Sequence, residues 1–181
     1  MNTTESADSL DIFSYPGSHC EIEPATNTTP QPHKKSTYET VTDIDKLDAF
    51  LSTVRDTIAI DTETTGLDTN TDKIVGISLA ANDEHGVYIP IRHRVSSNDL
   101  FGGDRPAPNQ LSIDTVYKKL WPIFTNPHIT KIGHNLKYDF HIMENEGWST
   151  SEIRPINDTM LMSYVLYGSL HGHGLDELAT R

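Results

Sequence analysis

Two carboxylates one residue apart follow a short apolar run, and this junction constrains the fold more than any other segment. The run is Ile58–Ile60, and Asp61 and Glu63 follow with Thr62 between them. Side chains alternate between the faces of a β-strand, so the two carboxylates project to the same side. Neighbouring anions raise each other's pKa unless a cation lies between them. The segment is either half of a site for a hard divalent cation or a strand end that runs into a polar turn at Thr64–Gly66.

Residues 1–36 differ in composition from the rest of the chain. They are rich in Ser, Thr, Asn, Pro and Glu without a hydrophobic period, which is typical of a disordered tail or interdomain linker. The remainder, 37–181, has the length of one domain with a sizeable core. The single cysteine, Cys20, excludes an intramolecular disulfide. No signal peptide or membrane span is recognisable, which favours a cytoplasmic protein without a membrane partner.

Hydrophobic periodicity divides residues 37–181 into strands and helices. Strands are predicted at Tyr38–Val41, Thr57–Ile60, Lys73–Ala80, Gly86–Ile91 and Ile129–Ile132. Helices are predicted after a cap at Thr42 or Asp43, at Ile113–Phe124, at Lys137–Glu146 ahead of Gly147, at Thr159–Tyr167 after the cap Asp158, and from Leu175. Turn formers between the second, third and fourth strands predict an antiparallel meander, and Arg94–Gln110 is expected to be a surface loop. This order suits an α/β, ribonuclease H-like fold in three layers, with helices flanking a mixed sheet of the meander plus a parallel strand.

A third carboxylate, Asp139, lies where a predicted strand leads into a helix. The segment Gly133–Asp139 places it in the first turn of that helix, where the backbone dipole favours a negative charge. That stabilisation alone can explain the residue. The edge of a sheet is also where an α/β fold gathers ligands from separate segments. Beside Asp61 and Glu63, Asp139 would complete much of a two-metal site.

The carboxylate segments resemble motifs of one nuclease superfamily. Asp61–Glu63 with Gly66–Asp68, and Asn135–Asp139, resemble the first and second exonuclease motifs of the DEDD superfamily. The sequence between and after them is similar to the proofreading 3′–5′ exonuclease domain of bacterial family A DNA polymerases, the DNA polymerase I type, at Ile74–Ala80, Val87–Ile91, His93, Asp158–Leu161, Ser163 and Tyr164. This similarity runs from about Tyr38 to Arg181.

The resemblance implies an enzyme that removes mismatched nucleotides from a DNA 3′ end, single-stranded or frayed, during replication and repair. It implies that Asp61, Glu63 and Asp139 are catalytic ligands of two Mg²⁺ ions, with Mn²⁺ as a possible substitute. A hard cation lowers the pKa of bound water and stabilises charge developing on phosphate. A polymerase domain is expected in the same parent chain.

Five further residues match positions near the substrate in the family. Leu67 matches a position that wedges against the terminal bases, and the alternative is a turn residue tucked into the core. Asn135 and Tyr138 match positions beside the substrate strand, and Thr62 and Thr64 are expected to offer backbone contacts there. For these four residues, ordinary structural roles are an equal alternative.

The chain departs from the family pattern at its C-terminal end. The third motif, a tyrosine and an aspartate four residues later, would lie on a helix beyond Arg181. Asp158 is better explained as a helix cap, and Asp176 as an acid in a first helical turn, than as replacements. We therefore expect a C-terminally incomplete fragment of a larger polymerase, with exposed apolar surface and weak or no activity alone.

Four other residues near that end have structural interpretations. Tyr164 and Tyr167 lie on an apolar helix face and are expected in the core. His171 and His173 have no clear third ligand, which favours a flexible surface loop over a metal site.

The charge balance keeps two other functions open. With 26 Asp and Glu against 14 Lys and Arg, the net charge of −12 counts against a free-standing DNA binder. One alternative is a catalytically silent domain that binds nucleic acid or supports a polymerase core. A second is a ribonuclease D-like exoribonuclease, which would prefer RNA ends.

Overall fold

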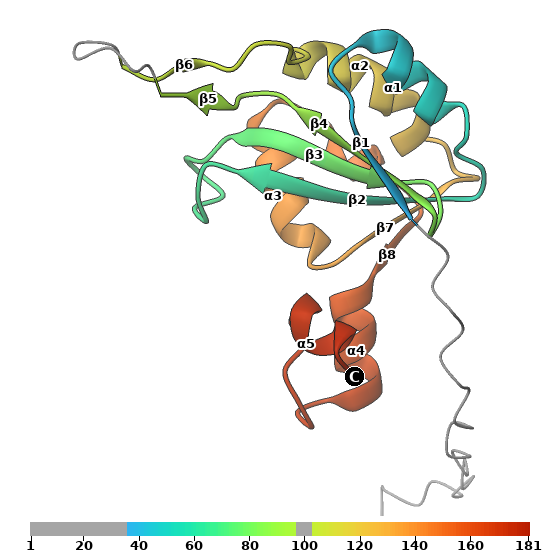
Figure 1. Ribbon diagram of the computed structural model, residues 1–181. Coiled ribbons are helices and arrows are strands. Elements are labelled where there is room, and N and C mark those ends of the chain that lie inside the picture. Colours follow the sequence, from blue (N-terminus) through green and yellow to red (C-terminus); the bar gives the residue numbers. More distant parts are fainter. Residues whose placement is uncertain (1–35, 97–102) are drawn as a thin grey trace, which may run out of the picture. The chain divides into compact units, whose positions relative to one another are not determined.

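The computed structural model describes residues 36–96 and 103–181 (Figure 1). The predicted tail, residues 1–36, lies outside the described residues except for Ser36, and Cys20 lies outside them too. Among the described helices, none has the length and apolar character needed to cross a membrane.

Six strands form one mixed sheet in the order β1-β4-β3-β2-β7-β8. Their bounds are β1 (Thr37–Thr40), β2 (Thr57–Thr64), β3 (Ile74–Ala80), β4 (His85–Pro90), β7 (Thr130–Gly133) and β8 (Ile156–Asp158). The predicted antiparallel meander of β2, β3 and β4 is confirmed, as is a parallel strand, β7, beside β2. Two further parallel pairs, β1 with β4 and β8 with β7, go beyond the prediction. The α/β, ribonuclease H-like fold class is confirmed.

One predicted loop contains strands. Within Arg94–Gln110, β5 (Arg94–Val95) pairs with β6 (Arg105–Pro106) in a small separate ladder. The loop prediction was wrong at these positions because strands of two residues are too short to show a hydrophobic period.

Strand β2 is longer than the apolar run that predicted it. It continues through the carboxylate pair to Thr64, and its register against β3 shifts between Glu63 and Thr64. Ile58, Ile60 and Thr62 are buried on one face, whereas the side chains of Asp61 and Glu63 are exposed on the other. The two carboxylates therefore belong to the strand itself rather than to a turn that follows it.

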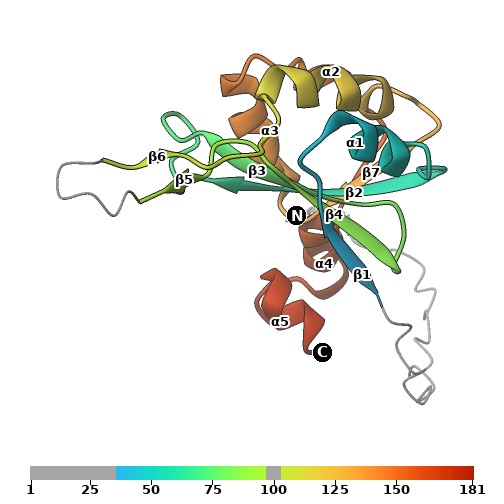
Figure 2. The same ribbon diagram turned by 45° about the horizontal axis from the view of Figure 1, so that its top comes forward.

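Helices lie on both sides of the sheet. They are α1 (Ile44–Leu51), α2 (Ile113–Phe124), α3 (Leu136–Asn145), α4 (Thr159–Tyr167) and α5 (Leu175–Ala179), with a 3₁₀ turn at Thr150–Glu152. Figure 2 shows α1 and α2 over one side and α4 and α5 on the other. Ser112 caps α2 and Asp158 caps α4, so both helices begin where a side chain accepts from their first backbone N–H groups.

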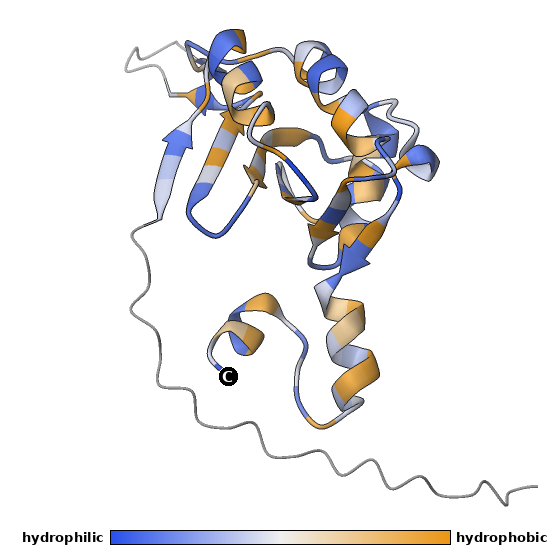
Figure 3. Cartoon of the chain, turned by 90° about the vertical axis from the view of Figure 1, so that its right-hand side faces the viewer, coloured by the Kyte–Doolittle hydropathy of each residue, from blue (hydrophilic) through white to orange (hydrophobic). Residues whose placement is uncertain are grey.

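The side chains of α4 and the following turn are largely solvent-exposed. Figure 3 shows the hydrophobic colouring of α4. The exposed apolar residues here include Leu161, Val165, Leu166 and Leu170, and Leu175 at the start of α5 is exposed too. Tyr164 and Tyr167 are 53% and 48% exposed, so the prediction that they lie in the core was wrong. An apolar helix face predicts burial only where another element covers it, and no described element covers α4 in this way.

Candidate functional site

Asp61 and Glu63 lie on the exposed face of β2, opposite the face on which Ile58, Ile60 and Thr62 are buried. Partial burial raises the pKa of the Asp61 carboxyl, the negative charge of Glu63 raises it further, and His134 opposes the rise. A cavity of about 520 Å³ opens beside them. Asp61 and His134 line it together with Leu79 and Tyr88 of β3 and β4. Of the two carboxylates, Asp61 thus lies in the lining of a largely apolar hollow.

Asp139 reaches the same part of β2 from α3. Beyond Ala59, β2 no longer pairs with β7, so its edge is free to accept another partner. Oδ1 of Asp139 accepts from the backbone N–H of Thr62 at 2.9 Å and from its hydroxyl at 2.6 Å. Burial raises the pKa of Asp139 to about 6, the Thr62 hydroxyl opposes the rise, and the charge of Asp61 adds to it.

The chemistry of this group suits a hard cation, although the described residues do not form a closed metal cage. The negative charge of Glu63 raises the pKa of Asp61, and that of Asp61 raises the pKa of Asp139. A divalent cation bound near these carboxylates relieves the repulsion between them. In the part of the chain that the structure describes, no group of three or more His, Cys, Asp or Glu side chains is arranged to hold a metal. Magnesium is commonly bound through one or two carboxylates plus water and substrate phosphates, so the residues fit an ion completed by its substrate.

The predicted substrate residues lie on the loop after β2 and on α3. The hydroxyls of Thr64 and Tyr138 lie 2.7 Å apart, and both donate to the carbonyl of Gly66 at 2.7 Å. Leu67 follows and is 90% exposed, which excludes the alternative that it is tucked into the core. Thr62 is buried, and its N–H and hydroxyl are occupied by Asp139.

Asn135 stands where β7 leads into α3, and Asp158 fixes the turn. Asn135 has a left-handed backbone, with φ of 64°, directly before the first residue of α3. Oδ1 of Asp158 accepts from the N–H of Asn135 at 3.1 Å and Oδ2 from that of Leu136 at 2.8 Å. The same carboxylate accepts from Met160 and Leu161 at the start of α4. The predicted cap of α4 is confirmed, and Asp158 also holds the start of α3, which no local pattern indicates.

Asp158→Ala is expected to lower the free energy of unfolding by about 2 kcal/mol, because two helices lose a cap worth roughly 1 kcal/mol each. Urea unfolding measures the loss, and Asp158→Asn, which keeps one acceptor oxygen, should lose less. Asp114→Ala removes an exposed acid from the first turn of α2 and serves as the matched control. Equal losses in Asp158→Ala and Asp114→Ala would contradict the double cap.

His134 is a site residue that the sequence did not indicate. Its Nδ1 lies 2.9 Å from the hydroxyl of Thr159, and that hydroxyl donates to the carbonyl of Gly133 at 3.1 Å. The hydroxyl proton is thus used, so Nδ1 of His134 is the donor in this contact. Nε2 is buried without a hydrogen-bond partner. His134 directly precedes Asn135, so its position next to the second motif is the one sequence signal that could have pointed to it.

Of the two C-terminal histidines in the connection between α4 and α5, His171 is half-buried and His173 is buried. His173 is 6% exposed, and its Nε2 donates to the carbonyl of Gly168 at 2.7 Å. Its Nδ1 then accepts from the Ser163 hydroxyl at 2.7 Å, and its ring lies 3.7 Å from that of Tyr164 between centroids. The loop prediction was wrong for His173, because a local sequence gives no sign of burial against another helix.

Comparison with known proteins identifies the family. A family model described as 3′–5′ exonuclease matches residues 38–181. DNA polymerase I of Rhizobium leguminosarum is 34% identical over 161 residues, which cover 83% of this chain and 16% of that protein. DNA polymerase I of Pseudomonas aeruginosa is 32% identical over 146 residues, covering 80% and 15% respectively. The chain therefore spans about one-sixth of the length of these relatives.

Solved structures with the same fold are more distant in sequence. Brucella melitensis NrnC bound to pGG shares 24% identity with a TM-score of 0.53, over 81% of this chain and 59% of that one. The POL domain of Pol1 from M. smegmatis, in complex with DNA primer-template and dNTP, shares 20% with a TM-score of 0.56, over 80% and 22%. These similarities support the fold, and the family match supports the identity: the chain belongs to the 3′–5′ exonuclease family of family A DNA polymerases.

Proposed function

We propose that this chain is a metal-dependent 3′–5′ exonuclease domain that hydrolyses the terminal phosphodiester of DNA, within a DNA polymerase I-like protein. The observation that carries the proposal is the meeting of three carboxylates at one end of β2. Asp61 and Glu63 come from the strand, and Asp139 bonds to Thr62 between them. Carboxylate oxygens are the hard donors that divalent cations take, and paired divalent cations serve phosphoryl-transfer reactions.

In this proposal Asp61, Glu63 and Asp139 hold two Mg²⁺ ions, with Mn²⁺ as a substitute. When bound, such ions lower the pKa of water and stabilise charge on the reacting phosphate. The chain's own residues orient this site: Thr62 fixes Asp139, and the Gly66 carbonyl contacts of Thr64 and Tyr138 fix the loop.

The exposed side chain of Leu67 suits a wedge against the terminal base, because it projects from this braced loop rather than packing into the core. Asn135 and Tyr138 are proposed to contact the substrate strand.

The domain is proposed to span residues 37–181, with residues 1–36 as a tail or linker. Its substrate is proposed to be a single-stranded or frayed DNA 3′ end, supplied by a polymerase domain of the same polypeptide during replication and repair. The relatives support this assignment, since they are DNA polymerases. Exposed apolar side chains on α4 are consistent with further contacts in such a protein.

Excision of a 5′-labelled single-stranded DNA under single-turnover conditions tests the function. We expect slow, Mg²⁺- or Mn²⁺-dependent shortening from the 3′ end in single-nucleotide steps. Asp61→Asn should reduce the rate by roughly 10²–10³-fold, as expected when a group that stabilises the transition state is lost. Asp114→Asn, an exposed substitution on α2, should leave the rate unchanged. If the unsubstituted chain and Asp61→Asn shorten the DNA at equal rates, the activity comes from a contaminant and the proposal is rejected.

A silent nucleic-acid-binding or structural domain is the second candidate. The lack of a closed metal cage among the described residues favours it, and the net charge of −12 favours the structural over the nucleic-acid-binding form. It predicts retention of labelled DNA, measured by fluorescence anisotropy, without any metal-dependent shortening. A labelled RNA strand in the same assay separates the exodeoxyribonuclease from a ribonuclease D-like activity.

A further inference from the structure

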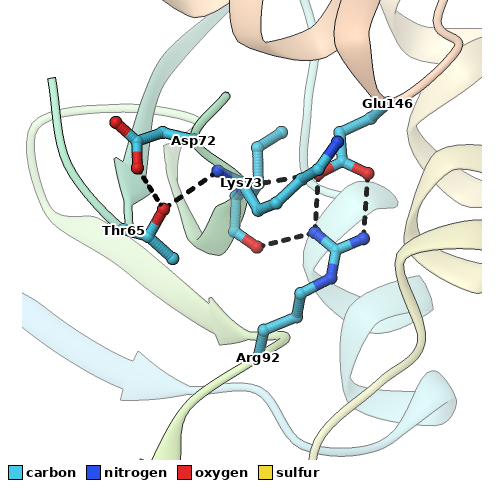
Figure 4. Close-up of polar contacts among 6 residues, drawn as sticks. Thr65, Asp72, Lys73, Arg92 and Glu146 are labelled. Carbon is cyan, nitrogen blue, oxygen red and sulfur yellow. Dashed lines mark hydrogen bonds and ion pairs between the residues drawn. The ribbon is translucent and has the colours of Figure 1, made fainter. Parts of the chain in front are cut away.

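An ion pair joins Glu146, at the end of α3, to Arg92, which follows β4, and both residues also contact the backbone of Ile74 at the start of β3. Nη1 and Nη2 of Arg92 donate to the two carboxylate oxygens of Glu146 at 2.7 and 2.8 Å (Figure 4). Nη1 of Arg92 also donates to the carbonyl of Ile74 at 2.8 Å, and the Ile74 N–H lies 3.4 Å from Oε1 of Glu146. The Glu146 side chain is 7% exposed and that of Arg92 34%. This contact is stronger than an ordinary surface ion pair, because it is bidentate and partly shielded from water.

The ion pair stands opposite the strand end that carries the carboxylates. Ile74 is the register partner of Thr64, directly after the shift that follows Glu63. Glu146 follows the last residue of α3, and Asp139 lies two turns earlier on the same helix. A tilt of α3 about its N-terminal end would therefore move Glu146 most and shift Asp139, in the first turn, by a smaller amount relative to Thr62.

The turn between β2 and β3 is held by its own bonds. The Thr65 hydroxyl donates to Asp72 at 2.5 Å and accepts from the Lys73 N–H at 3.1 Å (Figure 4). Asp72 also accepts from the Asp68 N–H at 2.7 Å. These bonds hold the β2–β3 hairpin together as one unit, and α3 is a separate unit. Tyr138 and Asn145 join α3 to the hairpin through neutral contacts, and Asp139 joins it through its bonds to Thr62. The ion pair of Glu146 with Arg92 is a further link, because Arg92 also donates to the Ile74 carbonyl.

We propose that Arg92 and Glu146 are positioning residues that hold α3 against the β2–β3 hairpin, so that Asp139 keeps its contact with Thr62 beside Asp61 and Glu63. The consequence for metal binding rests on the proposed function. The contact itself does not, because it is a property of the fold that can be measured without metal or substrate.

Amide hydrogen exchange of Thr62, followed by NMR on the full chain without metal, tests the proposal. The Thr62 N–H is protected by Asp139, and amides of the central strand β3 report global opening. Glu146→Gln keeps the shape of the side chain but removes its charge. We expect Thr62 to exchange about tenfold faster in Glu146→Gln, as for loss of a charge-assisted hydrogen bond, with β3 amides changing much less. Arg92→Lys keeps the charge without the bidentate geometry and should give an intermediate rate.

Lys119→Gln is the matched control, since it breaks the 2.6 Å ion pair with Asp48 between α2 and α1. It should leave Thr62 exchange unchanged. Equal acceleration of Thr62 and β3 amides in Glu146→Gln, or no acceleration at all, overturns the positioning role.

Mn²⁺ affinity of the same proteins, measured by calorimetry, gives the second readout, with several-fold weaker binding expected in Glu146→Gln. If the unsubstituted chain binds no Mn²⁺, the proposed function fails while the exchange rates still decide the positioning role. Unchanged affinity alongside selective Thr62 acceleration overturns the link to the metal site.

Discussion

Replacing Lys131 by methionine is expected to lower the free energy of unfolding by about 3 kcal/mol. Lys131 is fully buried on β7, and its ammonium donates to the carbonyls of Asn126, Ile129 and Arg154 at 2.9, 2.6 and 2.7 Å. Methionine fills similar volume but removes the ammonium from one buried and two part-buried carbonyls, at a cost of roughly 1–3 kcal/mol each, although the Asn126 carbonyl still accepts from the Ile129 N–H at 3.2 Å. Removing the buried charge offsets part of that cost. Urea unfolding at pH 7 measures the difference, and Lys118→Met, on an exposed face of α2, is the matched control.

The pH dependence of that difference has a definite sign. Burial lowers the pKa of Lys131 from 10.5 to about 8. Between those values the unfolded chain keeps the proton that the folded chain has released, so the stability of the unsubstituted chain rises with pH relative to Lys131→Met. Below pH 8 both states carry the proton and the difference is constant. A loss under about 1 kcal/mol at pH 7, or a difference that falls between pH 8 and 10, contradicts the role assigned to the three carbonyls.

Elements whose signals are local were predictable from the sequence. The helix predicted at Ile113–Phe124 has those same bounds in the structure, and that at Thr159–Tyr167 does too. Both begin after a residue whose side chain accepts from the first helical N–H groups, which is a signal contained within four residues. Strand β8 was missed because its three residues become a strand only through pairing with Lys131–Gly133 of β7.

The candidate site also combines features that the local sequence predicts with contacts that it does not. Period-two alternation is enough to put Asp61 and Glu63 on one face, and the strand bears this out. The contact of Asp139 with Thr62 joins residues 77 positions apart, and that of Arg92 with Glu146 joins residues 54 apart. No local period encodes such pairs. A left-handed Asn135 and a doubly used Asp158 are likewise consequences of how β7, β8 and two helices meet.

Asp139→Asn is expected to stabilise the metal-free chain by about 2 kcal/mol at pH 7.5. The pKa of Asp139 is raised from 3.8 to about 6, chiefly by burial, so ionising this group costs the folded state about 3 kcal/mol more than the unfolded state. An asparagine oxygen still accepts from the Thr62 N–H and hydroxyl, although these bonds are weaker than those to a carboxylate, which offsets roughly 1 kcal/mol. Urea unfolding of both proteins measures the gain. The isosteric pair Asp114→Asn, exposed on α2, should show no comparable gain.

The gain must disappear in acid, because between pH 3.8 and 6 the folded chain holds a proton on Asp139 that the unfolded chain has released. Stability of the unsubstituted chain therefore falls as pH rises through about 6, whereas that of Asp139→Asn does not, and the two converge near pH 4. A divalent cation should reverse the order at pH 7.5: it raises the melting temperature of the unsubstituted chain, whose anions it pairs, more than that of Asp139→Asn. A gain that persists at pH 4 would show that the amide stabilises by packing and not by removing charge. A cation effect equal in both proteins would place the ion away from Asp139.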